Sequence, residues 1–118
     1  MTRHLSEDQF VEALSKLKIP GGLQVEFLLA HAQAKGRAMT MRRLAEEAGY
    51  STWSGMNLRY GHLAKRIGQA AGISNPDITL LVEFVPPKGR SPENTSNVEW
   101  ILVMDEHFAS ALKKVGWI

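Results

Sequence analysis

The spacing of apolar residues changes once along this chain of 118 residues, at the turn sequence Ser74–Asp77. Before the turn, apolar residues recur every three or four positions, which is the period of amphipathic helices. After it they alternate, which is the period of half-buried strands. The alternating residues are Leu80, Val82 and Phe84 in one run and Val98, Trp100, Leu102 and Met104 in the next. We therefore expect an α+β domain that is mostly helical, with paired strands at residues 78–85 and 98–104.

Four or five helices are expected, and capping residues mark where several of them begin. Ser6 and Gln9 form a capping box, Thr40 is a natural N-cap, and Asp105 caps the last helix. The second helix is expected to pack through Val25, Leu28, Leu29 and Ala32. The expected spans are residues 6–19, 23–34, 40–48, about 51–71 and 105–116, with a short extended piece at 37–39.

A tight turn at Gly49 and Tyr50 separates the third helix from the fourth, because glycine readily takes the left-handed conformation that ends a helix. The fourth helix has two faces at about 100° per residue. Its apolar face carries Met56, Tyr60, Leu63, Ala64 and Ile67, and its outer face carries Leu58, Gly61, His62, Lys65 and Gln69, flanked by Arg59 and Arg66. The outer face is therefore cationic, and residues as small as Gly55 and Gly61 would let another backbone come close.

A helix-turn-helix followed by a two-stranded hairpin is the winged-helix arrangement. We expect one domain, whose parts are an N-terminal helix extension (1–21), the helix-turn-helix (40–72), the wing hairpin (78–104) and a C-terminal helix (105–118). The polar loop of the hairpin, residues 86–97, has a basic tip at Lys88 and Arg90. Tyr60, Trp100 and Trp117 are expected in the core.

Charge is unevenly distributed, although the net charge is only +2. Residues 35–73 hold seven basic and two acidic side chains, a local charge of +5, and the rest of the chain holds seven basic and ten acidic ones, or −3. A basic segment in an otherwise acidic chain is expected of a phosphate-binding face. The alternative interpretation is a solvated helix surface, which can carry the same excess of basic residues.

In a winged helix, the helix after the turn enters the DNA major groove and the hairpin loop reaches the backbone. The residues expected to meet base edges are Thr52, Trp53, Ser54 and Asn57, and Asn57 is a residue type that pairs bidentately with adenine. The residues expected to contact phosphates are Arg42, Arg43, Arg59, Lys65 and Arg66, with Lys88 and Arg90 from the wing. For Trp53 the alternative is a hydrophobic lid over the turn.

Three features over about residues 39–117 carry a resemblance: Leu-Ala-x-x-x-Gly-Tyr at the turn, Asn57-Leu58-x-Tyr60-Gly61-x-Leu63 in the fourth helix, and the pairs Glu99-Trp100 and Gly116-Trp117. This segment resembles one found near the N-terminus of some bacterial HNH endonucleases of the McrA-like, modification-dependent kind. The resemblance implies a DNA-facing accessory domain. The chain lacks the nuclease portion and its histidine-asparagine-histidine metal cluster, so we expect no DNA cleavage.

Several function classes are disfavoured by what the sequence lacks. The chain has no cysteine, and its histidines (His4, His31, His62 and His107) are scattered without ligand spacing, so no metal or other cofactor is expected. Glu46 and Glu47 point about 100° apart on a helix and are expected to be solvated. No phosphate loop or nucleophile set is present, which argues against an enzyme. No apolar run suits a membrane span or signal peptide, so we expect a cytoplasmic protein.

Two functions remain. The first is a DNA-binding module, either a small regulator or a detached targeting domain of a bacterial restriction or defence system, with double-stranded DNA and a nuclease subunit as expected partners. The second is a protein–protein interaction module on the same fold. The apolar Leu58 on the outer face favours the second, and the clustered basic residues favour the first.

Overall fold

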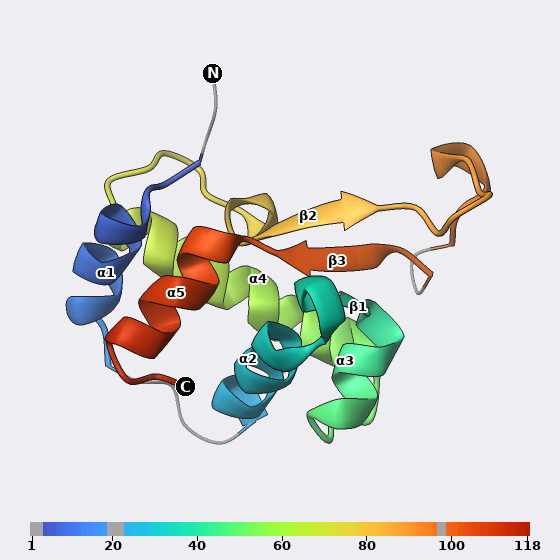
Figure 1. Ribbon diagram of the computed structural model, residues 1–118, viewed down its shortest axis with the longest axis horizontal. Coiled ribbons are helices and arrows are strands. Elements are labelled where there is room, and N and C mark those ends of the chain that lie inside the picture. Colours follow the sequence, from blue (N-terminus) through green and yellow to red (C-terminus); the bar gives the residue numbers. More distant parts are fainter. Residues whose placement is uncertain (1–3, 19–22, 97–98) are drawn as a thin grey trace.

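The computed structural model describes residues 4–18, 23–96 and 99–118. Within them, five helices and a small antiparallel sheet form an α+β fold that is mostly helical (Figure 1). The helices are α1 (Glu7–Ser15), α2 (Leu23–Gln33), α3 (Met41–Glu47), α4 (Trp53–Ala70) and α5 (Glu106–Lys114). The strands are β1 (Ala38–Thr40), β2 (Val82–Val85) and β3 (Ile101–Met104), and short 3₁₀ turns occupy Lys35–Arg37, Ile78–Leu80 and Pro92–Asn94.

The capping residues expected from the sequence are confirmed. Ser6 and Gln9 form the reciprocal capping box of α1. The Thr40 hydroxyl oxygen accepts from the Arg43 amide at 3.1 Å and begins α3, and Asp105 accepts from the Phe108 amide at 2.9 Å and begins α5. Each side chain satisfies an amide that the first helical turn leaves without a partner. Side-chain caps close in sequence therefore determine where these three helices begin.

The sheet has three strands in the order β1-β3-β2, so it contains one strand more than the expected two-stranded hairpin. β1 pairs with β3, with Met39 opposite Leu102, and β2 pairs with the other edge of β3, with Phe84 opposite Leu102. The first strand of the hairpin is also shorter than the expected 78–85, because the Asp77 carboxylate accepts from the Thr79 amide at 2.9 Å and starts a 3₁₀ turn. The expected strand residue Val98 lies outside the described residues.

The core lies between α4 and the other elements. The predicted inner face of α4 is confirmed, since Met56, Tyr60, Leu63, Ala64 and Ile67 are all buried. α1 packs on α5 through Phe10 and Phe108, whose ring centroids lie 5.3 Å apart. Trp117 is buried, as the sequence predicts, whereas Trp100 is only half-buried and packs against the edge of the core.

The predicted packing face of α2 is only partly confirmed. Leu28 is buried and Ala32 packs against the core as predicted, but Leu29 is 38% exposed, and Phe27 and His31 are buried instead. The reason is that α2 is apolar almost all round, so hydrophobic spacing selects no face. Tertiary contacts determine which face of α2 is buried. The centroid of the Phe27 ring lies 4.8 Å from that of the Tyr60 ring of α4.

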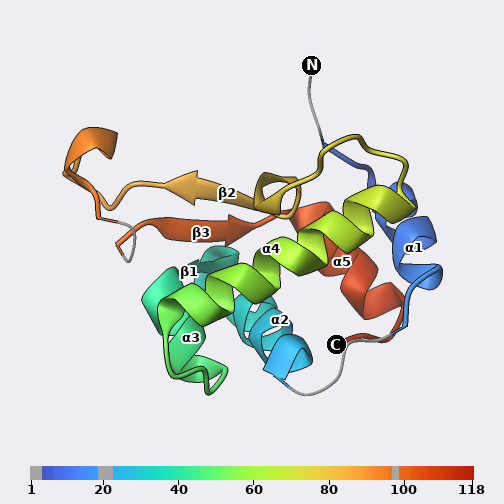
Figure 2. The same cartoon turned by 180° about the vertical axis from the view of Figure 1, so that it is seen from behind.

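The far end of α4 is held by a close approach at Gly68. A Cβ atom at this position would lie 2.2 Å from Pro76 Cβ, so only glycine lets the segment after α4 fold back so closely. In Figure 2, α4 crosses the face of the molecule that is turned toward the reader, while α1 and α5 lie at one end and the loop of residues 86–96 projects from the other. None of the described helices is both long and apolar enough to cross a bilayer.

Candidate nucleic-acid interface

The turn between α3 and α4 is fixed by the backbone and by a ring contact. Gly49 has a φ of 79°, the left-handed conformation expected there. The Tyr50 amide donates to the Ala45 carbonyl at 2.9 Å, which closes the end of α3. The Tyr50 ring lies 6.3 Å from the Phe27 ring and joins the edge of the core. The orientation of α4 relative to α3 is therefore set by packed residues.

A buried hydrogen-bond chain holds α4 to α2 and β3. The two ring nitrogens of His31 lie 2.9 Å from the Tyr60 hydroxyl and 2.8 Å from the Leu102 carbonyl oxygen. Because a carbonyl only accepts, Nε2 donates to Leu102 and Nδ1 accepts from Tyr60, which defines a neutral imidazole. Burial lowers the pKa of His31 to about 4 and raises the pKa of Tyr60. Sequence reasoning missed this role of His31, the only buried polar residue in the described part.

With its inner face anchored in this way, α4 presents its opposite face to solvent. Asn57, Leu58, Arg59, His62, Lys65, Arg66 and Gln69 are all exposed. No ion pair in the described part of the chain engages Arg59, Lys65 or Arg66. Residues 48–76 contain no aspartate or glutamate, a signal that is readable in the sequence. The face therefore carries uncompensated positive charge.

The residues predicted to meet base edges differ in their exposure and in their contacts within the fold. Ser54 and Asn57 are exposed in the first turns of α4. Thr52 is the N-cap, and its hydroxyl oxygen accepts from the Gly55 amide at 3.1 Å and from the Ser54 hydroxyl at 3.3 Å. Trp53 is half-buried and packs against the core, in line with the lid alternative. Ser54 and Asn57 are thus the more available pair.

The two arginines of α3 also differ. Arg43 makes an ion pair with Glu47, with 3.0 Å between Nε and Oε1, and both side chains are exposed. Arg42 is exposed and lies close enough to Glu99 for its charge to contribute to a lowered pKa of that carboxyl group, whose main cause is a hydrogen bond from the Ser96 hydroxyl. Arg42 and Arg43 also line a hollow of about 510 Å³ beside β1, together with Lys35 and Glu46.

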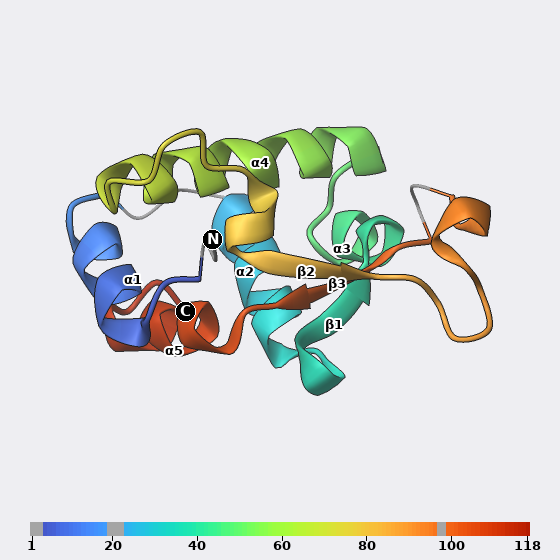
Figure 3. The ribbon, with the colours of Figure 1, turned by 90° about the horizontal axis from the view of Figure 1, so that it is seen from above.

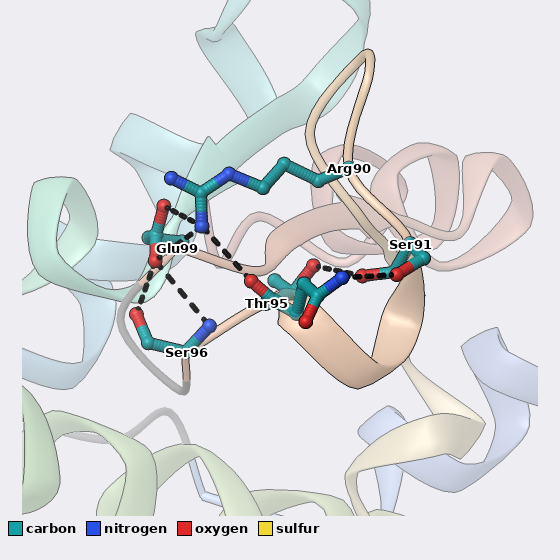
Figure 4. Close-up of polar contacts among 6 residues, drawn as sticks. Arg90, Ser91, Thr95, Ser96 and Glu99 are labelled. Carbon is teal, nitrogen blue, oxygen red and sulfur yellow. Dashed lines mark hydrogen bonds and ion pairs between the residues drawn. The ribbon is translucent and has the colours of Figure 1, made fainter.

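The loop between β2 and β3 is held by its own polar contacts (Figure 4). Arg90 Nη1 lies 3.2 Å from a Glu99 carboxylate oxygen and donates to the Asn94 carbonyl at 2.9 Å. The other Glu99 oxygen accepts from the Ser96 hydroxyl at 2.6 Å. Arg90, predicted as a phosphate contact, therefore already has a carboxylate partner. Lys88 is exposed at the tip.

The loop and the start of α4 lie at the same end of the molecule (Figure 3). Ser54 and Asn57 belong to that end of the helix, whereas Lys65 and Arg66 lie roughly 12 Å or more farther along it at about 1.5 Å per residue. The structure thus places the base-edge candidates at the same end of the molecule as the β2–β3 loop and distributes the cations along the helix.

Two further features bear on catalysis. A hollow of about 670 Å³ beside β2 and β3 has a mixed lining that includes His4, Arg37, Glu83 and Asp105. Among the described residues, no group of three or more histidine, cysteine, aspartate or glutamate side chains is arranged to hold a metal ion.

Comparison of the chain with protein-family models, curated proteins and solved structures gives no match. The function is therefore argued from the residues and their arrangement.

Proposed function

We propose that this chain is a winged-helix DNA-binding module in which α4 enters the major groove and the loop of residues 86–96 lies along the backbone. The observation that carries the proposal is the outer face of α4, which is exposed, free of acidic residues and lined by Arg59, Lys65 and Arg66 without ion-pair partners in the described chain. Double-stranded DNA is a polyanion that such a face attracts by releasing counterions.

The order of elements supports the same proposal. Helix α2, strand β1, the α3–turn–α4 unit and the β2–β3 hairpin follow one another, and β1 pairs on the side of β3 opposite β2. In this order the α3–turn–α4 unit precedes a hairpin whose loop projects at the end of the molecule where α4 begins (Figure 3), and a winged helix has the same order of elements. The resemblance to the DNA-facing segment of McrA-like HNH endonucleases agrees with it. We place the chain as a non-enzymatic targeting module of a restriction or defence system, or as a small regulator.

The proposed roles follow the availability of each side chain. Ser54 and Asn57 are exposed and meet base edges, while Thr52 and Trp53 position the start of the helix. The phosphate contacts are Arg42, Arg59, Lys65, Arg66 and Lys88, joined by Arg43 and Arg90 once these exchange a carboxylate for a phosphate. The exchange is inexpensive, because exposed ion pairs contribute only about 0–1 kcal/mol.

The test is duplex binding measured by fluorescence anisotropy over a salt series. Affinity is expected to fall linearly with the logarithm of salt concentration, with a slope of about 0.9 for each phosphate contact. Asn57→Ala should weaken binding to a preferred duplex by about 1–3 kcal/mol and leave binding to random duplexes nearly unchanged. Gln69→Ala, at an exposed position near the other end of α4, is the matched control. Absence of salt-dependent binding would refute the proposal.

One observation favours the second candidate, a protein–protein interaction module. Leu58 lies on the outer face of α4 with 57% of its surface exposed, and apolar side chains are common at the centre of protein interfaces. A protein partner held by apolar contacts would bind with little dependence on salt, whereas duplex binding would be weak at every salt concentration. The same salt series therefore distinguishes the two functions.

A further inference from the structure

Leu58 is the most exposed large apolar side chain among the described residues. Its exposed fraction is 57%, and the only other such side chain, Leu29 of α2, is at 38%. Trp53, five residues earlier in α4, packs against the core, but Leu58 does not join the apolar residues that do so. Its apolar surface is therefore available to a ligand.

Leu58 projects from the middle of the outer face. Tyr60 is fully buried, and two residues correspond to about 200° around a helix, so Leu58 points away from the core. Ser54, one turn before it, is small, and a Cβ atom added at Gly61, one turn after it, would meet nothing within 4 Å. The leucine thus stands between two small residues, and another molecule can approach the helix closely there.

The charge around Leu58 indicates the kind of molecule that covers it. Arg59, Lys65 and Arg66 belong to the same exposed part of α4 and have no carboxylate partner in the described chain. An apolar protein groove would have to desolvate or neutralise these cations, whereas a DNA groove supplies phosphates beside them. The surface therefore suits a ligand that is anionic at its edges and apolar at its centre.

The major groove offers one apolar group on its unmodified bases, the C5-methyl group of thymine. We infer that Leu58 is a specificity-determining residue that contacts a thymine methyl group in the major groove, an inference that rests on the proposed DNA-binding function. Its neighbour Asn57 is exposed and is of the type that pairs with adenine, the partner of thymine. Together they favour sites rich in A·T pairs.

The test replaces thymine by uracil, which removes the methyl group and keeps the base pair and its hydrogen-bonding groups. Duplexes enriched from a random pool by the parent protein are resynthesised with uracil at each thymine position in turn. At one position or more, the parent should bind the thymine duplex about fourfold more tightly, the equivalent of burying one methyl group. Leu58→Ala should bind both duplexes equally, and Leu58→Met, which keeps an apolar side chain at this position, should retain the preference.

The result that overturns the inference is salt-dependent duplex binding by the parent with no difference between thymine and uracil at any position, or a preference that survives in Leu58→Ala. Leu58 is exposed, so its variants should unfold at the same temperature as the parent, and a thermal melt verifies this. Failure of the proposed function looks different, because then no duplex binds at any salt concentration.

Discussion

Acid should destabilise this protein in part through one buried residue, His31. Its ring is buried and neutral, and it joins the Tyr60 hydroxyl to the Leu102 carbonyl. Protonation would turn Nδ1 into a donor facing the Tyr60 hydroxyl and would place a charge in the core beside the cationic Arg37. The folded state therefore resists protonation, and the pKa of His31 falls from 6.5 to about 4.

The size of the effect follows from the two pKa values. Between pH 6.5 and about 4 the unfolded chain binds a proton at His31 that the folded chain does not, so the free energy of unfolding falls as pH falls. Linkage gives a decrease of about 2 kcal/mol from pH 7 to pH 5 and about 3 kcal/mol by pH 4. Above pH 6.5 the stabilisation is fully present.

The assay is urea unfolding followed by tryptophan fluorescence at pH 7, 6 and 5, with His31→Gln as the matched variant. Glutamine can donate to the Leu102 carbonyl and accept from the Tyr60 hydroxyl, yet it does not titrate. Carboxylates elsewhere titrate equally in both proteins, so the difference between the two free energies isolates His31. That difference should shift by about 2 kcal/mol between pH 7 and pH 5. Parallel curves for the two proteins would refute the reasoning.

Further predictions concern α4. Gly68→Ala should destabilise the fold by about 1–3 kcal/mol because its Cβ would overlap Pro76, whereas Gly61→Ala, in open space on the same helix, should stabilise it by up to about 1 kcal/mol. Equal effects in urea unfolding would contradict the close approach at Gly68. Tyr60→Phe should cost about 1–3 kcal/mol by leaving His31 Nδ1 without a donor. An unchanged midpoint in thermal unfolding would show that this bond contributes nothing.

Features that depend on residues close together in the chain were predictable. The capping box of Ser6, the N-caps at Thr40 and Asp105 and the turn at Gly49 each rest on a few neighbouring residues. The buried face of α4 was also predictable, because its 18 residues repeat the pattern several times.

Features that depend on contacts between segments far apart in the chain were not predictable from the sequence. β1 has only three residues, too few for an alternation, and its pairing with β3 joins segments far apart in the chain. The buried face of α2 depends on where Phe27 meets Tyr60 rather than on spacing. For the candidate site, the sequence indicated the cationic face of α4. The ion pair of Arg90 with Glu99 was not predictable, because it depends on how the loop between β2 and β3 folds.

The proposal that the outer face of α4 binds DNA is tested most directly by removing the three cationic side chains of that face. Arg59, Lys65 and Arg66 are replaced together by alanine, and the matched control replaces Lys16, Lys18 and Lys113, which are also exposed, lie outside the basic segment 35–73 and change the net charge equally. Duplex affinity is then measured for both variants and the parent over one salt series. The α4 variant should bind all duplexes more weakly, with a salt slope lower by about 0.9 for each phosphate that it no longer neutralises, while the control keeps a slope close to that of the parent. An α4 variant that binds as tightly as the parent at low salt, with the same slope, would contradict the assignment of α4 as the DNA-binding helix.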